Sequence, residues 1–365
     1  MKTNIYFLAI LIGALLMTSC SDDDPEPEVV HNFPIGENGF FIVNEGGWGN
    51  GDASLSYYNR DSSEVYNDIF QTYAGRPLGD QAQSMSLIDS LGFIVVQNSV
   101  KIEVIHAYKF TSVTTIDGDD GLESPRYVLG VNENKAYITD WGSTGVNGTV
   151  KVLDLNTYEI TKTISTGNGA NKLIKRGDKV YVANQGGYSR DSTIAVIDVN
   201  TDELLKKIEV KGNPESLQLD ADGNIWVAGN GITIYNADYT EIIRQTPGYI
   251  ARIGEDDEVD FIWEATEGTG DINRLTINEA GDELYYSHAG GVYKLSTSAT
   301  ELPASALVSK SFYGLGFDPV SKEIIGGEAP NFSSAGTMYF YNTSGVETGS
   351  ESVGIGPNSF VFRNN

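Results

Sequence analysis

The sequence predicts an all-β fold: a seven-bladed β-propeller of four-stranded antiparallel blades, closed by a C-terminal strand that joins blade one. Three observations predict it. Short apolar runs recur seven times, two neighbouring copies are nearly superimposable, and the first copy lacks a strand that the end of the chain can supply. A repeat of about 40 to 45 residues is typical of a four-stranded blade.

The seven runs each have an aromatic or aliphatic residue at their centre and are expected to be the second strand, strand b, of each blade. These central residues are spaced 52, 44, 44, 45, 59 and 40 residues apart: Phe41, Phe93, Tyr137, Tyr181, Trp226, Tyr285 and Ile325. We interpret the long 59-residue step as an excursion between blades five and six, covering residues 245–270 and carrying Phe261, Ile262 and Trp263.

The clearest internal match lies in blades three and four. Residues 152–164 reappear 44 residues later as residues 196–208, with Val, Asp, Asn, Thr, Glu, Lys and Ile kept at matching positions. Alternating apolar residues predict strand c, the Asp-x-Asn-Thr sequence predicts a turn, and the residues after it predict strand d. Each blade is therefore expected to end in a c–d hairpin.

The ends of the domain complement each other. The first copy begins at its strand b, and residues 359–363 form an apolar segment with no strand after it. This segment is expected to be the inner strand of blade one, because such pairing leaves no open edge in the ring. A pair of β-sandwiches, the alternative fold, predicts neither the sevenfold repeat nor this complementarity.

The amino terminus predicts a targeting signal. Residues 1–19 combine Lys2, an apolar run over residues 5–17 and small residues before Cys20, the only cysteine. The run is too short to span a bilayer, so we interpret it as a lipoprotein signal peptide with lipidation at Cys20. A simple secretory peptide is the alternative. No intramolecular disulfide can form.

Residues 20–37 predict an acidic flexible tether, and residues 38–365 the propeller. The tether resembles the tag that sends some Gram-negative lipoproteins to the outer face of the outer membrane, which implies a lipid-anchored protein exposed on the cell surface. A solvated spacer without any address is the alternative.

The charge restricts the partners. The chain has 24 Lys and Arg against 50 Asp and Glu, a net charge of -26. Nucleic acid is an unfavourable partner because phosphates are bound by clustered cations. Anionic lipid is disfavoured for the same reason, so contact with a membrane is expected through the lipid anchor only.

The candidate binding residues lie in loops that a propeller gathers at one face, the b–c loops and the connections between blades. Aromatic rings and amides among glycines suit a large, weakly charged ligand. The alternative is that Gly and Asn only form loops and that Trp48 and Trp141 pack between blades. The predicted ligand contacts are Asn44, Trp48, Trp141, Asn184, Gln185, Tyr188, Arg190 and Phe332. The connections between blades add Gln81, Gln83, Arg126, Asn171, Lys172, Asn213, Glu215, Asn273, Arg274, Tyr313 and Asn358.

Signatures of catalysis are nearly missing from the sequence. There are three histidines, and no nucleophile elbow, phosphate-binding loop or metalloprotease motif. The calcium-like residues 220–224 lack the closing Glu and read as a hairpin turn. We therefore predict no enzyme, no cofactor and no metal, although loop carboxylates could still gather around a divalent ion: Glu45, Asp80, Glu215, Asp271 and Glu328.

Residues 179–184 and 194–201 resemble the repeat of YncE-type seven-bladed propellers. Residues 41–46, 274–286, 291–295 and 312–319 are similar to the surface lipoprotein propellers of gut-type Gram-negative bacteria. Some members of that branch (BtuG-type) capture cobalamin, so the resemblance implies a corrinoid ligand and a TonB-dependent outer-membrane transporter as partner. Two other functions stay open: a protein-binding or adhesive propeller, and a metal-dependent lactonase or lyase.

Overall fold

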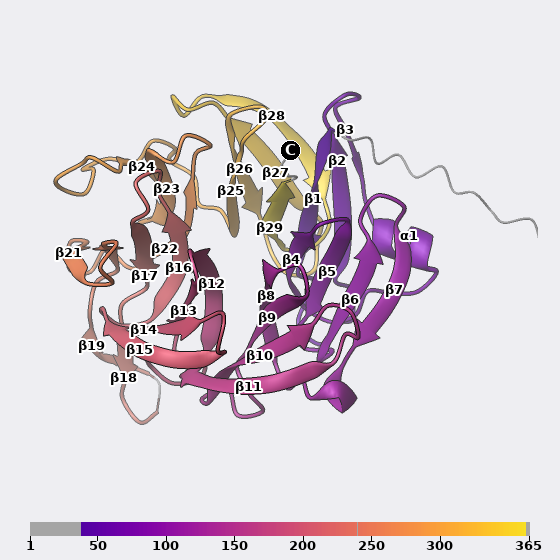
Figure 1. Ribbon diagram of the computed structural model, residues 1–365. Coiled ribbons are helices and arrows are strands. Elements are labelled where there is room, and N and C mark those ends of the chain that lie inside the picture. Colours follow the sequence, from indigo (N-terminus) through magenta and orange to yellow (C-terminus); the bar gives the residue numbers. More distant parts are fainter. Residues whose placement is uncertain (1–37, 239, 363–365) are drawn as a thin grey trace, which may run out of the picture. The chain divides into compact units, whose positions relative to one another are not determined.

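Seven small β-sheets surround a common axis in the computed structural model, which describes residues 38–238 and 240–362 (Figure 1). The predicted signal peptide, Cys20 and the tether lie outside the described residues. Each sheet is antiparallel, as expected for blades. No helix among the described residues is long and apolar enough to cross a bilayer.

The strands of each blade are given from the axis outward. Blade one contains β29 (Pro357–Phe362), β1 (Gly39–Asn44), β2 (Ser54–Asn59) and β3 (Glu64–Tyr66). Blade two contains β4 (Ala82–Ile88), β5 (Leu91–Val96), β6 (Lys101–His106) and β7 (Thr111–Ile116). Blade three contains β8 (Pro125–Asn132), β9 (Lys135–Asp140), β10 (Gly148–Asp154) and β11 (Ile160–Gly167). Blade four contains β12 (Ala170–Arg176), β13 (Lys179–Asn184), β14 (Thr193–Asp198) and β15 (Glu203–Glu209).

Blade five contains β16 (Pro214–Leu219), β17 (Ile225–Gly229), β20 (Tyr249–Ile253) and β21 (Val259–Glu264). Blade six contains β22 (Ile272–Ile277), β23 (Glu283–His288) and β24 (Gly291–Ser296), and a single bridge from Val292 to Val308 stands in for a fourth strand. Blade seven contains β25 (Gly314–Asp318), β26 (Glu323–Glu328), β27 (Gly336–Tyr341) and β28 (Glu347–Val353). In the described part of the chain, two short helices lie in connections between blades, α1 (Ile69–Ala74) and η1 (Gly118–Asp120).

Burial explains why the apolar runs become strand b. All six residues of β1 are buried, because both faces of the strand are covered by neighbouring blades. Most residues of the outer strand β15 are exposed, and Ile208 is its buried residue. The predicted strand-b runs and the two repeated c–d hairpins are confirmed.

The ring closes as predicted. Successive inner strands pack against one another in cyclic order, from β4 through β25 to β29 and back to β4. Strand β29 pairs with β1 in the register Phe40–Phe362 to Val43–Ser359. The rings of Phe40 and Phe362 lie 5.0 Å apart. The last three residues, including Arg363 of the predicted closing strand, lie outside the described residues.

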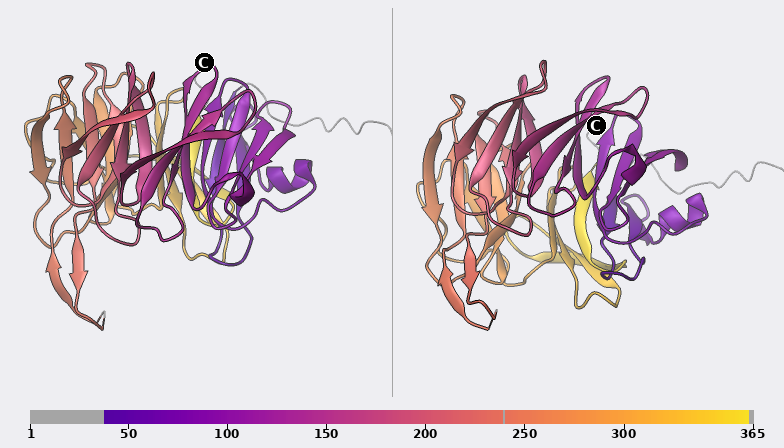
Figure 2. Two further views of the ribbon diagram at one scale, coloured as in Figure 1. Left: turned by 60° about the horizontal axis from the view of Figure 1, so that its bottom comes forward. Right: turned by 90° about the horizontal axis from the view of Figure 1, so that it is seen from below.

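The predicted position of the excursion is wrong. The extra residues form a hairpin, β18 (Thr233–Tyr235) with β19 (Ile242–Gln245), inserted inside blade five between β17 and β20. Figure 2 shows this hairpin projecting beyond one face of the ring. Phe261, Ile262 and Trp263 instead belong to β21, the outer strand of blade five. The β20–β21 hairpin, which is the c–d hairpin of blade five, lacks the Asp-x-Asn-Thr turn, so its sequence did not resemble the other copies.

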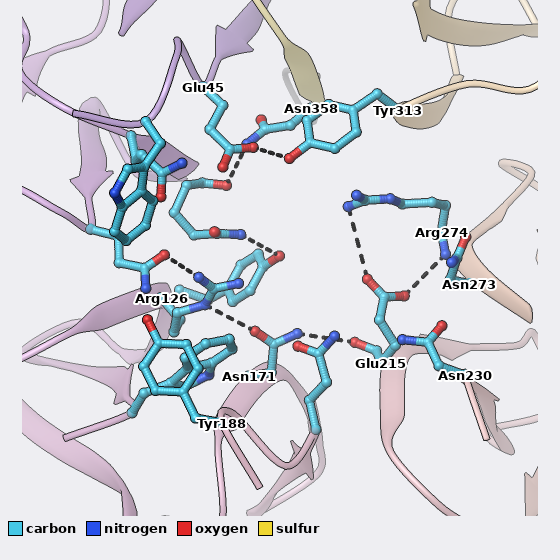
Figure 3. A pocket seen from close by; sticks show the side chains of 17 residues that line it. Glu45, Arg126, Asn171, Tyr188, Glu215, Asn230, Asn273, Arg274, Tyr313 and Asn358 are labelled. Atoms are coloured by element: carbon cyan, nitrogen blue, oxygen red, sulfur yellow. Dashed lines mark hydrogen bonds and ion pairs between the residues drawn. The ribbon is translucent and has the colours of Figure 1, made fainter. Parts of the chain in front are cut away.

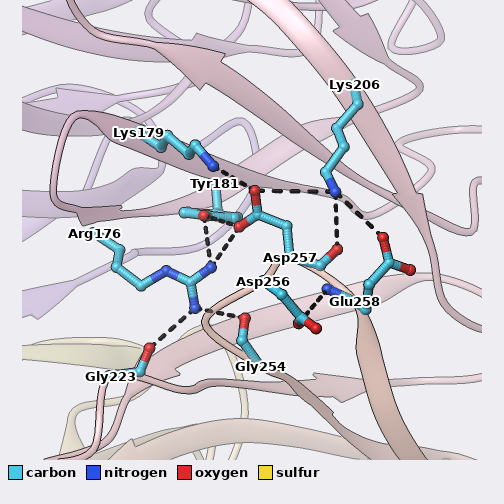
Figure 4. Close-up of polar contacts among 9 residues, drawn as sticks. All are labelled: Arg176, Lys179, Tyr181, Lys206, Gly223, Gly254, Asp256, Asp257 and Glu258. Atoms are coloured by element: carbon cyan, nitrogen blue, oxygen red, sulfur yellow. Dashed lines mark hydrogen bonds and ion pairs between the residues drawn. The ribbon is translucent and has the colours of Figure 1, made fainter.

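A clamp of polar contacts joins blades four and five (Figure 4). It lies near Lys179, where β13 begins, whereas Gln185 follows the other end of that strand. Asp257, in the β20–β21 turn, accepts hydrogen bonds from Arg176 and Lys179 at 2.5 Å each and from the Tyr181 hydroxyl. The neighbouring blades repeat the arrangement, where Lys135 and Tyr137 contact Asp202. The donors Lys179 and Tyr181 follow Lys135 and Tyr137 by 44 residues, whereas Asp257 follows Asp202 by 55 because the β18–β19 hairpin lies between them.

Candidate functional site

A pocket of about 350 Å³ lies on the ring axis, at the face where the b–c loops meet the connections between blades. Every blade contributes at least one lining residue: Glu45, Trp48 and Asn358 from blade one; Gln81, Gln83 and Gln97 from two; Arg126, Tyr127 and Trp141 from three; Asn171, Gln185 and Tyr188 from four; Glu215 and Asn230 from five; Asn273 and Arg274 from six; Tyr313 from seven. The wall is thus polar, with aromatic rings from blades one, three, four and seven.

Irregularities at the start of the inner strands position these side chains. In blades one to six the pairing register between the inner strand and strand b shifts there, as a β-bulge does. A bulge redirects a side chain out of the regular alternation. The residues at the shifts are Asn358, Gln83, Arg126, Asn171, Glu215 and Arg274. Six blades therefore each direct a polar side chain to the axis.

Arg126 is the centre of one side of the pocket (Figure 3). Its guanidinium lies over the Trp141 ring, 4.0 Å from the centroid. Nη1 donates to Gln97 Oε1, and Nε donates to Asn171 Oδ1 at 3.3 Å. Tyr188 packs edge-on against Trp141, with ring centroids 5.9 Å apart. Burial lowers the pKa of Arg126 from its ordinary value.

The other side holds two carboxylates that have partners. Glu215 Oε2 accepts the backbone N–H of Arg274 at 3.0 Å, and its Oε1 lies 3.9 Å from Arg274 Nη1. Burial acts to raise the pKa of Glu215, but the charges of Arg274 and Lys172 lower it overall. Glu45 accepts a hydrogen bond from the Tyr313 hydroxyl, and burial and Glu45 raise the pKa of Tyr313.

Four buried polar atoms of the lining have no hydrogen-bond partner: Trp141 Nε1, Gln185 Oε1, Asn230 Oδ1 and Asn358 Oδ1. They come from blades three, four, five and one. The orientation of Asn358 follows from its contacts, because Nδ2 donates to the carbonyls of Ala82 at 2.9 Å and Gln83 at 3.2 Å. Its Oδ1 is therefore an acceptor left unused by the protein.

Some of the predicted ligand contacts line the pocket and others do not. Trp48, Trp141, Gln185 and Tyr188 line the pocket together. Phe332 lies outside the lining, with its ring edge-on to Tyr313 at 5.0 Å, and Arg190 is exposed.

Asn44 and Asn184 are fully buried inside their blades. Asn44 Nδ2 donates to Ser54 and Ser56, and Asn184 Nδ2 donates to Thr193. Both amides tie the end of strand b to strand c.

The residues predicted on the connections between blades are mostly brought together in the pocket. Lys172 and Asn213 do not line it, whereas the other nine do. Three lining residues were missed: Gln97, Tyr127 and Asn230. Asn230 directly follows β17, which a correct placement of the excursion would have indicated.

The carboxylates considered for a metal are scattered. Glu45 and Glu215 line the pocket, and Asp80, Asp271 and Glu328 do not. Within residues 38–238 and 240–362, no three His, Cys, Asp or Glu side chains are grouped as a metal site would require.

Residues 38–352 match a family described as a domain of unknown function (DUF5074). The chain belongs to this family. No curated protein matches the sequence.

Solved structures share the fold at low sequence identity. A quinonprotein alcohol dehydrogenase-like protein from Bacteroides thetaiotaomicron is 15% identical with a TM-score of 0.65, over 90% of this chain and 78% of that one. The hydrazine synthase of Kuenenia stuttgartiensis is 12% identical with a TM-score of 0.58, over 84% and 90%. A dihydro-heme d1 dehydrogenase is 9% identical with a TM-score of 0.54, over 90% and 76%. These likenesses establish the propeller fold alone.

Proposed function

We propose that this DUF5074 protein is a ligand-capture propeller, which binds an amide-bearing small molecule at the axial pocket without changing it chemically. The observation that carries the proposal is the set of four unpartnered polar atoms around the pocket. Buried polar groups in proteins almost always have partners. A ligand with matching donors and acceptors would supply the missing partners.

The aromatic side of the pocket supports a ligand larger than the pocket itself. Trp48 and Tyr188 are 61% and 71% exposed, although both line the pocket. Such rings offer flat apolar surfaces at the mouth. A ligand can therefore place a broad face against these rings while a side group reaches the polar wall.

A corrinoid is the ligand class that we propose. Its ring is too broad for a pocket of about 350 Å³ and would lie across the mouth. Its peripheral carboxamides both donate and accept hydrogen bonds, as Trp141 Nε1 and Asn358 Oδ1 require. The resemblance to cobalamin-capturing propellers supports the same class.

We further propose that lipidation at Cys20 holds the protein at the outer membrane, exposed on the cell surface, and that bound ligand passes to a TonB-dependent transporter. The direction of β1 is compatible with this arrangement. β1 begins at Gly39 and runs to Asn44, next to pocket residue Glu45. The first described residues and the pocket thus lie at opposite ends of this strand.

Calorimetric titration of the purified protein with cyanocobalamin tests the ligand class. We expect saturable binding with a Kd of about 1 μM or tighter, and at least about a tenfold loss in Trp141→Ala. Trp263→Ala is the matched control, because Trp263 lies on β21 and does not line the pocket.

Lack of cobalamin binding at micromolar concentration would reject the corrinoid. A protein partner recovered equally by the native protein and by a Trp48→Ala, Trp141→Ala double variant would favour the protein-binding alternative. Bound divalent metal together with lactone hydrolysis would favour the enzyme alternative.

A further inference from the structure

Arg126 is an unusual cation in this chain. The other buried or half-buried arginines each pair with a carboxylate: Arg60 with Asp318, Arg76 with Glu103, Arg176 with Asp257, Arg252 with Asp260 and Arg274 with Glu215. Within the described part of the chain, Arg126 forms no such ion pair. Its hydrogen-bond partners are two neutral amides, and its guanidinium stacks on an indole.

A chain with 50 acidic residues has many carboxylates that could neutralise this cation. Removing a charge from water is unfavourable, and burial lowers the pKa of Arg126 although Tyr127 and the carboxylate of Glu45 act to raise it. Gln97 and Asn171 hold the guanidinium in place through neutral amide oxygens. They leave Nη2 without a protein acceptor among the described residues, so they do not supply the negative charge that would offset the cost of burial. The arrangement is suited to a ligand that brings the negative charge itself.

A second donor lies beside the guanidinium. Trp141 Nε1 is buried in the same lining and has no acceptor. An indole nitrogen can only donate, so it must meet an acceptor. Stacking on Arg126 and edge contact with Tyr188 hold the ring in place. Two fixed donors with no acceptors form a site for an oxyanion.

We propose that Arg126 and Trp141 form an oxyanion subsite, which binds one carboxylate or phosphate group of the captured ligand. This inference deepens the proposed capture function and rests on the same pocket. Glu45 and Tyr313 lie together on another side of the pocket (Figure 3), where a carboxylate would repel a second anionic group. The subsite therefore selects ligands with a single anionic group.

Tryptophan indole signals in a ¹⁵N-correlated NMR spectrum of the full chain test the subsite. The chain has four tryptophans, and Trp141→Phe assigns the signal of interest. Trp226 Nε1 donates to Asp220 at 2.8 Å in the core, so its signal reports on folding. The probes are sodium acetate and inorganic phosphate, with sodium chloride at equal ionic strength as reference.

We expect acetate or phosphate to shift the Trp141 signal saturably while the Trp226 signal stays in place. Arg126→Gln should weaken the probe at least about tenfold, since hydrogen bonds to charged groups are strong. Arg244→Gln, on the exposed strand β19, should leave the affinity unchanged. A response to acetate alone identifies a carboxylate group, and a response to phosphate alone identifies a phosphate group.

A Trp141 signal that ignores both probes in folded protein would overturn the subsite. An equal response in Arg126→Gln would overturn the role of Arg126. Corrinoid binding without any anion response would retain the proposed function and remove this inference. An anion response without corrinoid binding would do the reverse.

Discussion

At the scale of single residues, Asp257 shows how a repeat position becomes an attachment point between blades. Its carboxylate is 5% exposed and collects Arg176, Lys179 and Tyr181 of the preceding blade. Its backbone φ is positive, at 63°. Arg176 also donates to the carbonyls of Gly223 and Gly254, so the carboxylate completes a network.

Asp257→Asn should lower the free energy of unfolding by about 1–3 kcal/mol, because it leaves Arg176 and Lys179 without their counter-ion. Lys179 is 40% exposed, and solvent screening keeps the loss below that of a fully buried pair. Urea unfolding measures the change. Asp256→Asn is the control, since Asp256 is exposed and accepts only the N–H of Glu258, at 3.1 Å. Equal loss in both variants would contradict the clamp.

The difference in unfolding free energy between the native protein and Asp257→Asn should depend on pH. Burial acts to raise the pKa of Asp257, but Lys179, Tyr181 and Arg176 lower it below its ordinary value. The folded state therefore favours the carboxylate, and its contribution is present above the unfolded pKa of about 3.9. It is lost as the pH falls through the lower folded pKa. The stability difference between native protein and Asp257→Asn should be constant near neutrality and shrink below about pH 4; a constant difference at all pH values would refute the ion pair.

The residues that line the pocket were only partly predictable from the sequence. Glycine-rich loops with Trp48 and Tyr188 were visible, and the connections between blades contained Arg126 and Glu215. The sequence does not reveal where the β-bulges lie, because one extra residue hardly alters the residue types that are typical of a strand. Asn184, a predicted ligand contact, is the last residue of β13; its side chain points into the blade, whereas the next residue lines the pocket.

At the scale of elements, the β18–β19 hairpin is an insertion that the blade does not need. β17 and β20 pair directly, from Ile225–Ile253 to Gly229–Tyr249. At its base Thr246 and Ile232 exchange two hydrogen bonds, of 2.9 Å and 2.8 Å. Ile242 and Ile243 are exposed, so the hairpin adds little to the core.

Replacing residues 233–245 by Asn-Gly should change the free energy of unfolding by less than about 1 kcal/mol, because Ile232 and Thr246 already form a hairpin pair and shortening a loop costs little. Thermal and urea unfolding measure it. Removing residues 249–264 instead should abolish cooperative unfolding, since it deletes β20 and β21 with fully buried Tyr249 and Ile250. If the first deletion unfolds the protein and the second does not, the assignment of blade five is wrong.

The strands were predictable in those blades that share the same turn sequence between strands c and d. Residues 152–164 and 196–208 share both strands and the turn between them, so both hairpins were predicted, although the observed strands extend further, over Gly148 to Gly167 and Thr193 to Glu209. Blade five keeps the apolar residues of strand c but joins its strands through residues 254–258. The spacing between Trp226 and Tyr285 gave the length of the insertion and no information on its place.

At the scale of the whole molecule, ring closure is the condition on which the pocket depends. β29 supplies both the inner strand of blade one and the pocket residue Asn358. Phe360 and Phe362 cover the fully buried ring of Phe40. The N-terminal and C-terminal ends of the domain thus share one sheet, and the seven blades hold the lining residues of the axis at fixed positions.

A chain ending at Gly356 should lose its cooperative unfolding transition. Deleting β29 unpairs the edge of β1 and exposes Phe40 and Ile42, and each buried aromatic ring alone is worth about 3–5 kcal/mol. Such a loss approaches the total stability of a domain, about 5–15 kcal/mol. Circular dichroism during heating measures the transition, and adding a synthetic peptide of residues 357–365 should restore it, because the missing strand can pair in trans. A truncated chain that melts like the full one would mean that the ring does not depend on this strand, and the axial pocket would then have to persist without Asn358.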